Sequence, residues 1–300
     1  MNWKSFRDTI LKAGEAWIDD KAPRIGAALA FYMALSLSPL LVIFLAIAGM
    51  IYGEEAARGG IADQIAGVVG EQSAKSIEEI LANSKKPGSG ILALVIGAVT
   101  LIFGATGVFG ELQEAMNDVW KVRPKPGRPI STFLRARFLS FGMVMGVGFL
   151  LVVSLVLSTA MGAARQYMTD LLPALALVFQ LLNFLLTFAV EFFLFGMIFK
   201  VLPDAKLSWR DVLFGALLTA GLFNVGKYLI VLYLSLGGVG SAFGAAGSVV
   251  ALLVWIYYST QILIFGAEVT KVVAERAGRR IAPSHGAEAI PGADTPVISK

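Results

Sequence analysis

Long apolar intervals separated by short charged segments dominate the hydrophobic pattern of this chain. A membrane-spanning helix needs about 20 predominantly apolar residues at a rise of about 1.5 Å per residue. Six intervals lack charged residues, and each reaches that length alone or with its neighbour: 25–52, 88–110, 138–164, 171–190, 212–226 and 228–267. The pattern therefore predicts six transmembrane helices, over 25–52, 88–110, 138–164, 171–201, 212–236 and 242–269.

Composition supports an all-α, polytopic membrane fold. Hydrophobic residues make up 57% of the chain, charged residues only 15%, and the mean hydropathy is +0.74. These values lie outside the usual range for soluble domains. We therefore expect residues 23–276 to form one six-helix transmembrane domain.

The distribution of basic residues predicts the orientation of the domain. Most of the 25 lysines and arginines precede the first span, follow the last, or lie between spans two and three or four and five. The positive-inside rule then places both termini in the cytoplasm. The net charge of +4 accordingly reflects topology and contact with anionic lipid headgroups, and no nucleic-acid partner is expected.

Three segments outside the predicted spans have patterns of their own. Residues 1–22 place Trp3 and Ile10 on one face of an amphipathic helix, which either lies in the membrane interface or packs on the cytoplasmic end of the bundle. The outer loop, 54–87, predicts two short amphipathic helices between spans one and two. The tail, 277–300, is rich in Ala, Gly and Pro, which predicts disorder.

The chain lacks the residues that most enzyme sites require. Cysteine is absent, and the only histidine, His285, lies in the tail. The membrane domain therefore contains no His-based triad or zinc site. We expect no catalytic function and no cofactor.

Polar side chains recur within the predicted spans and are the positive functional signal. At 100° per residue, those of the fourth span fall within about 80° of arc. The fifth, sixth and first spans carry similar stripes, which implies a common polar interior. The candidate cavity residues are Gln180, Asn183, Thr187 and Glu191 in span four, Asn224 and Lys227 in span five, Tyr257 and Gln261 in span six, and Tyr32 and Ser36 in span one.

Depth along the helices suggests which of these groups meet. Counted from the cytoplasmic ends at 1.5 Å per residue, Glu191 is about 12 Å deep, Lys227 about 22 Å and Asn183 about 24 Å. A lysine at that depth costs about 2.5–3.5 kcal/mol if it is isolated, so it should face a polar cavity. We expect Asn183 to hold Lys227 there, with Glu191 below. A static ion pair that locks two spans together is an equal alternative.

A second acidic stripe lies where the second span enters the cytoplasm. Glu111, Glu114 and Asp118 are spaced for one helical face. Without histidine they form only a weak metal candidate. Pairing with nearby bases such as Lys121 is the favoured interpretation.

Four sequence blocks resemble the YihY/BrkB family of membrane proteins. They are AALAFYMALSLSPL at 27–40, GATGVFGELQEAMNDVWKV at 104–122, LPDAKLSWRDVLFGALLTA at 202–220, and SAFGAAGSVVALLVWIYYSTQILIFGAEVTKV at 241–272. The resemblance implies a multi-pass protein of a bacterial inner membrane with six helices. The family also carries a ribonuclease BN label and a serum-resistance or virulence label. The nuclease label finds no support in these residues, since no acid, base or metal cluster faces RNA.

Two functional classes remain. The first is a transporter or flippase for an amphiphilic, anionic, lipid-related solute, with Lys227 as counter-charge and Glu191 as proton-linked partner or gate. The second is a scaffold that organises envelope proteins or lipids without transport. The first predicts a polar cleft open to lipid, whereas the second predicts a filled core.

Overall fold

The computed structural model describes residues 3–35, 107–125, 176–236, 247–279, 281–284 and 286–290. These residues belong to two compact units. The first unit comprises residues 1–20, 113–224 and 263–300, and the second comprises 21–112 and 225–262.

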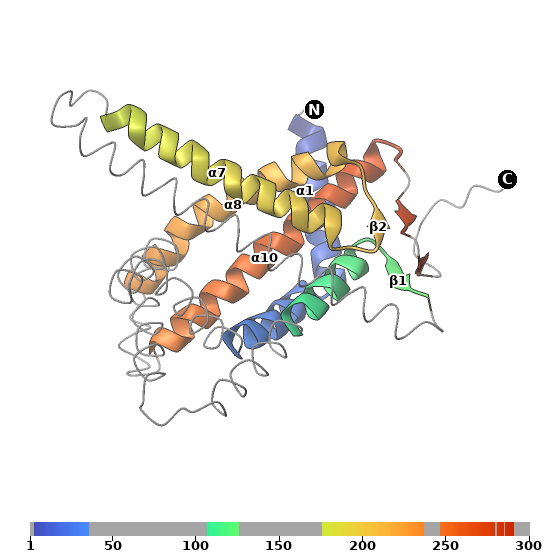
Figure 1. Cartoon of the computed structure of the whole chain (residues 1–300), viewed down its shortest axis with the longest axis horizontal. Coiled ribbons are helices and arrows are strands. Elements are labelled where there is room, and N and C mark those ends of the chain that lie inside the picture. The colour runs from blue at the N-terminus through green and yellow to red at the C-terminus, as the bar shows by residue number, and fades with distance from the viewer. Residues whose placement is uncertain are drawn as a thin grey trace, which may run out of the picture. The chain divides into compact units, whose positions relative to one another are not determined.

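Three of the described helices are long and apolar enough to cross a membrane. They are α7 (Ala176–Val201), α8 (Trp209–Leu236) and α10 (Gly247–Arg276) (Figure 1). They match the predicted fourth, fifth and sixth spans. Ala22–Leu35 forms a shorter apolar helix at the start of the first predicted span. The third span, 138–164, and the outer loop, 54–87, lie outside the described residues, as does most of the second span.

Helix α1 (Trp3–Asp19) packs against the first turns of α8 and the last turns of α10. Its Ala13 is fully buried with Val269 and Val272 of α10. Ile10 packs on the same cluster, together with Phe214 and other partly buried side chains of α8 and α10. Packing on the helical bundle therefore accounts for the buried face of α1.

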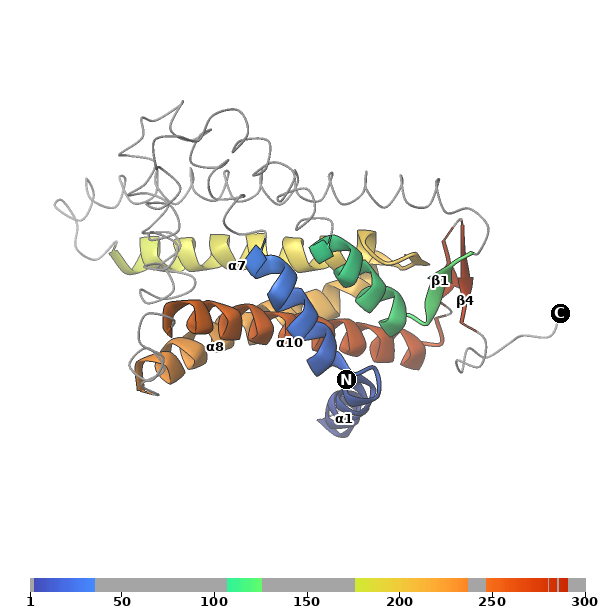
Figure 2. The same ribbon diagram turned by 90° about the horizontal axis from the view of Figure 1, so that it is seen from below.

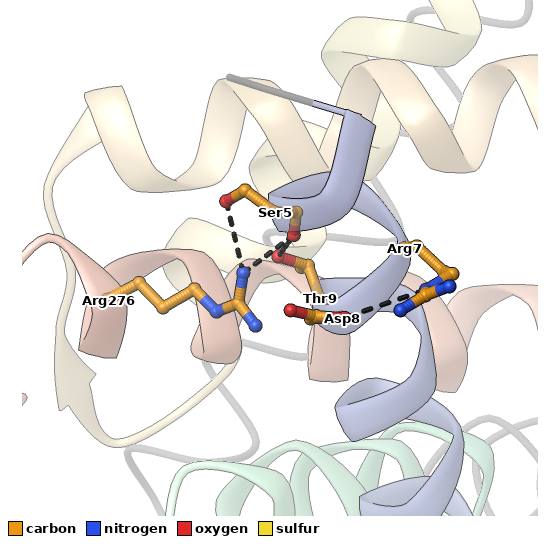
Figure 3. Close-up of polar contacts among 5 residues, drawn as sticks. All are labelled: Ser5, Arg7, Asp8, Thr9 and Arg276. Carbon is orange, nitrogen blue, oxygen red and sulfur yellow. Dashed lines mark hydrogen bonds and ion pairs between the residues drawn. The ribbon is translucent and has the colours of Figure 1, made fainter.

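An arginine at the end of α10 ties down the beginning of α1. Arg276 Nη1 donates to the Ser5 carbonyl at 2.6 Å and to Ser5 Oγ at 3.2 Å (Figure 3). Thr9 Oγ1 donates to the same carbonyl at 2.8 Å. A cation at a helix C-terminus also interacts favourably with the helix dipole.

Helices α8 and α10 approach closely through a reciprocal glycine–threonine arrangement. Thr219 Oγ1 donates to the Gly215 carbonyl on its own helix at 2.6 Å, and Thr270 Oγ1 donates likewise to Gly266 at 2.7 Å. Each threonine also lies over the glycine of the opposite helix. A Cβ atom built on Gly215 would fall 1.6 Å from Thr270 Oγ1, and one on Gly266 would fall 1.8 Å from Thr219 Oγ1. Only glycine permits this approach.

The polypeptide tail forms two short antiparallel pairings. Strand β1 (Val122–Pro124) pairs with β4 (Ala287–Ala289), and the two lie side by side in Figure 2. Strand β2 (Ala205–Lys206), between α7 and α8, pairs with β3 (Ala282–Pro283).

The prediction of a disordered tail is therefore wrong for residues 282–283 and 287–289. Backbone hydrogen bonds hold this segment in place of a large apolar core. The Ser284 amide donates to the Asp204 carbonyl at 2.8 Å, and the Ile290 amide donates to the Lys121 carbonyl at 3.0 Å. Ala287 is buried, and Arg123 Nη2 lies 2.8 Å from Glu288 Oε1.

Candidate functional site

A carboxylate and an amide meet where α7 and α8 pack together. Asn224 Nδ2 of α8 donates to Glu191 Oε2 of α7, and also to the Ala220 carbonyl at 2.9 Å. Both side chains are half-buried. Beside them, Phe195 and Phe223 pack edge to face with ring centroids 5.5 Å apart. The structure thus joins the polar stripes of two candidate spans at one point, flanked by an aromatic pair.

The polar stripe on α7 becomes more buried toward this point. Gln180 and Asn183 are exposed, whereas Thr187 and Glu191 are half-buried. The exposed end of α7 is strongly apolar, with Leu177 75% exposed and Leu181 57% exposed. The sequence predicts a base, Lys227, as a possible partner of Glu191. The structure adds Asn224 as a hydrogen-bond donor to this carboxylate.

Lys227 lies one turn beyond Asn224 on α8. Residues three apart on a helix share a face, so the lysine continues the stripe that Asn224 begins. Its side chain is half-buried. Next to it, Gly226 packs under the ring of Tyr258, whose Cε1 atom lies 2.4 Å from the position of a Cβ. The small residue thus lets α10 approach α8 beside Lys227.

The second unit assembles the predicted polar residues of α10 and the first span. Gln261 Nε2 donates to the Ala22 carbonyl at 3.3 Å, while its buried Oε1 has no hydrogen-bond partner among the described residues. The Tyr257 ring lies 3.3 Å from the Cβ position of Gly26. Tyr32 packs on Gly107, where a Cβ would fall 2.6 Å from its ring. Ser36 lies outside the described residues.

The acidic stripe at Glu111, Glu114 and Asp118 lies on a helix over 107–119. Within the described ranges, no three Asp, Glu or His side chains are arranged to hold a metal ion. Burial raises the pKa of Asp118, and the charge of Glu114 raises it further, against the opposing effect of Lys121. Lys121 binds Asp20 at the end of α1. Lys121 therefore acts electrostatically on Asp118 while it binds Asp20, and the pairing of the stripe with bases stays a prediction.

Two further carboxylates organise the connection between α7 and α8, and the sequence analysis does not single them out. Asp204 accepts hydrogen bonds from Asn117 at 3.1 Å and Gln113 at 3.3 Å, and its own amide donates to Asn117 Oδ1 at 2.8 Å. Asp211, in the first turn of α8, is buried and lies 2.6 Å from Arg279 Nε. In the sequence, Asp204 and Asp211 lie just outside two apolar intervals. That position is the signal by which sequence reasoning could have found them.

Comparison with known proteins places these features in a family. Residues 13–291 match the family described as Virulence factor BrkB. The UPF0761 membrane protein of Pseudomonas paraeruginosa is 27% identical over 263 residues, which cover 84% of this chain and 59% of that protein. The UPF0761 membrane protein of Pseudoalteromonas atlantica is 26% identical over 253 residues, 82% of this chain and 79% of its relative. No solved structure matches.

Proposed function

From the membership of this chain in the virulence factor BrkB family and from its polar contact between apolar helices, we propose that it moves an amphiphilic, anionic, lipid-related solute. The proposed setting is a bacterial inner membrane, with six spanning helices and both termini in the cytoplasm. The proposed partners are membrane lipids and the solute itself, with no cofactor and no nucleic acid.

The hydrogen bond between Asn224 and Glu191 carries the proposal. Asn224 is a neutral donor, so this hydrogen bond stabilises the Glu191 carboxylate without itself supplying a charge. If the contact served only to join α7 to α8, two neutral polar groups would do so without the cost of placing an ionisable group in an apolar helix. The presence of a carboxylate at this position therefore favours a role in handling charge.

The proposed roles follow from the order of residues along the helices. Lys227, one turn from Asn224, provides positive charge for an anionic headgroup. Glu191 takes up or releases a proton, or acts as a gate, as the headgroup passes. Gln180, Asn183 and Thr187 extend the polar stripe along α7, and its exposed leucines provide an apolar surface for acyl chains.

Transport is proposed in preference to catalysis. The chain has no cysteine, and its single histidine lies in the tail. A nuclease or hydrolase would need a base, a nucleophile or a metal cluster facing its substrate. Within the described residues, the intramembrane contact offers one carboxylate and one amide.

Reconstituted vesicles test the proposal. The purified protein is incorporated into liposomes that carry fluorescent phosphatidylglycerol or, separately, fluorescent phosphatidylcholine, and movement between leaflets is followed by chemical quenching. We expect faster movement of the anionic lipid, abolished by Lys227→Met and strongly reduced by Glu191→Gln. Lys206→Met, at an exposed lysine of β2, is the matched control and should retain transport.

The two functional classes give different results in this assay. Size-exclusion profiles first establish that each variant is folded. A folded wild-type protein that moves neither lipid would contradict the transport proposal. Retained transport in Lys227→Met would contradict the assigned role of the lysine. Envelope defects in cells that carry such a transport-inactive but folded protein would instead favour a scaffold.

A further inference from the structure

A buried carboxylate lies near the end of α10, away from the contact between Glu191 and Asn224. Glu268 has a relative exposure of 0%, and neither of its carboxylate oxygens has a hydrogen-bond partner among the described residues. The Lys271 ammonium is 3.8 Å away, which is too long for a hydrogen bond. A fully buried carboxylate with no donor is among the most costly arrangements in a protein.

A second carboxyl group faces Glu268 from the end of α1. The Asp20 carboxyl lies within hydrogen-bonding reach of Glu268. Asp20 Oδ1 binds the Lys121 ammonium, whereas its buried Oδ2 has no hydrogen-bond partner in the described part of the chain. Two carboxyl groups therefore approach each other with one unsatisfied oxygen on Asp20 and two on Glu268.

Other charged side chains lie near these two acids. Lys121, at the end of the 107–119 helix, and Lys271, on α10, are the bases that act on Glu268. Asp20 is the acid that acts on Glu268. On the 107–119 helix, Asp118 interacts with Glu114, Lys121 and Asp20. Burial raises the pKa of Asp118, and the charges of Glu114 and Asp20 raise it further, against the opposing effect of Lys121. Lys121 is engaged with Asp20, and Lys271 is too far from Glu268 to donate a hydrogen bond, so one added proton supplies the donor that the Asp20–Glu268 pair lacks.

We propose that Asp20 and Glu268 form a proton-binding site in which the two carboxyl groups share one proton taken from water. The protonated Glu268 donates its O–H to Asp20 Oδ2. Asp20 remains ionised against Lys121, and two of the three unsatisfied oxygens gain a partner. This site is separate from the Glu191–Asn224 contact, and it stands whether or not the protein moves a solute.

A proton fits this cluster better than a metal ion. Calcium and magnesium need about six oxygen ligands. Here three carboxylate oxygens are unsatisfied, and the two lysine ammonium groups nearby repel a cation. Lys121 is 32% exposed and Lys271 13% exposed, so they connect the buried pair to solvent. Loss of the proton would leave Glu268 charged beside Lys271, which gives the site two states.

Infrared difference spectroscopy of the full chain tests the shared proton directly. The carbonyl stretch of a protonated carboxylic acid is recorded near neutral pH and bleached by raising the pH. We expect the band in the wild type and in Glu275→Gln, the matched control at an exposed position of α10. The band should be lost in Glu268→Gln and shifted in Asp20→Asn. A wild type without the band, or an unchanged band in Glu268→Gln, overturns the proposal.

Thermal unfolding gives an independent readout. Glutamine mimics the neutral acid, so Glu268→Gln should fold and should melt with little dependence on pH. The wild type should match it in acid and lose stability as the pH rises, because the unfolded chain then releases a proton that the native site still holds, so folding must take a proton from solution. If Glu268→Gln is destabilised at neutral pH or fails to fold, the ionised form is required and the proposal fails. A band removed by sodium at constant pH would show a cation site instead.

Discussion

A methyl group at Gly266 has no room in the contact between α8 and α10. Its Cβ would lie 1.8 Å from Thr219 Oγ1, 3.0 Å from Thr219 Cβ and 3.2 Å from Phe199 Cζ. Thr219 is held in place because its hydroxyl donates to the Gly215 carbonyl at 2.6 Å. Gly266→Ala must therefore separate the helices or break that hydrogen bond. Overpacking of this kind costs about 1–3 kcal/mol.

The apparent melting temperature of the purified protein, followed by tryptophan fluorescence, measures this cost. One kcal/mol corresponds to roughly 2–4 °C for a chain somewhat shorter than this one. Gly221→Ala on α8 is the matched control, because nothing lies within 4 Å of its Cβ position. That substitution should be neutral or raise stability by up to about 1 kcal/mol, since alanine has the higher helix propensity.

A second substitution distinguishes a local clash from a general effect of the methyl group. Thr219→Ala removes the atom at 1.8 Å and leaves the contact at 3.0 Å, so it should restore part of the stability lost in Gly266→Ala. Thr270→Ala should restore less of the stability lost in Gly215→Ala. The Gly266 carbonyl oxygen would still lie 3.0 Å from the Cβ atom added at position 215. If Gly266→Ala melted at the same temperature as Gly221→Ala, the close approach of the helices would be incorrect.

Two further predictions concern polar groups of the first unit. Asn224→Leu removes the donor to Glu191 Oε2 and should lower the unfolding free energy by about 1–3 kcal/mol, and the double variant with Glu191→Leu should melt closer to the wild type. Burial and the charge of Glu114 raise the pKa of Asp118 in the native state. A proton on Asp118 therefore stabilises the native state in acid. This stabilisation is lost as the pH rises through the raised pKa. Asp118→Asn should therefore be at least as stable as the wild type near neutral pH, and a melting profile in which it is the less stable protein there would refute this sign.

The hydrophobic pattern predicts the three long apolar helices among the described residues, and it predicts their ends less well. The predicted end of span four coincides with the end of α7 at Val201. Helix α8 begins at Trp209, three residues before the predicted span. Its start is set by Ser208, whose Oγ accepts a hydrogen bond from the Arg210 amide. The charge-free interval begins only at residue 212. Likewise α10 continues past 269 to Arg276. Charge marks the limit of the apolar segment, whereas capping hydrogen bonds mark the end of the helix.

Contacts between helices are harder to predict, because periodicity identifies a face but not its partner. The stripe on α7 contains Glu191 and that on α8 contains Asn224, yet their contact depends on the relative rotation and depth of two helices. The glycine–threonine contact of α8 and α10 gave no sequence signal, since each glycine is isolated within its helix. Strands of two or three residues such as β2 and β4 are too short to show any alternation.

The neutral contacts of the first unit bear on why charge is retained in α7. Thr219 and Thr270 join α8 to α10 with hydroxyl groups that satisfy carbonyls of their own helices. The pair Phe195–Phe223 and the contact of Gly196 with Ala216 join α7 to α8 without charge. Because both interfaces have neutral packing of their own, Glu191 is not needed to associate the helices. Its carboxylate adds an energetic cost that this packing does not require, and that cost supports the proposed role of Glu191 in handling charge.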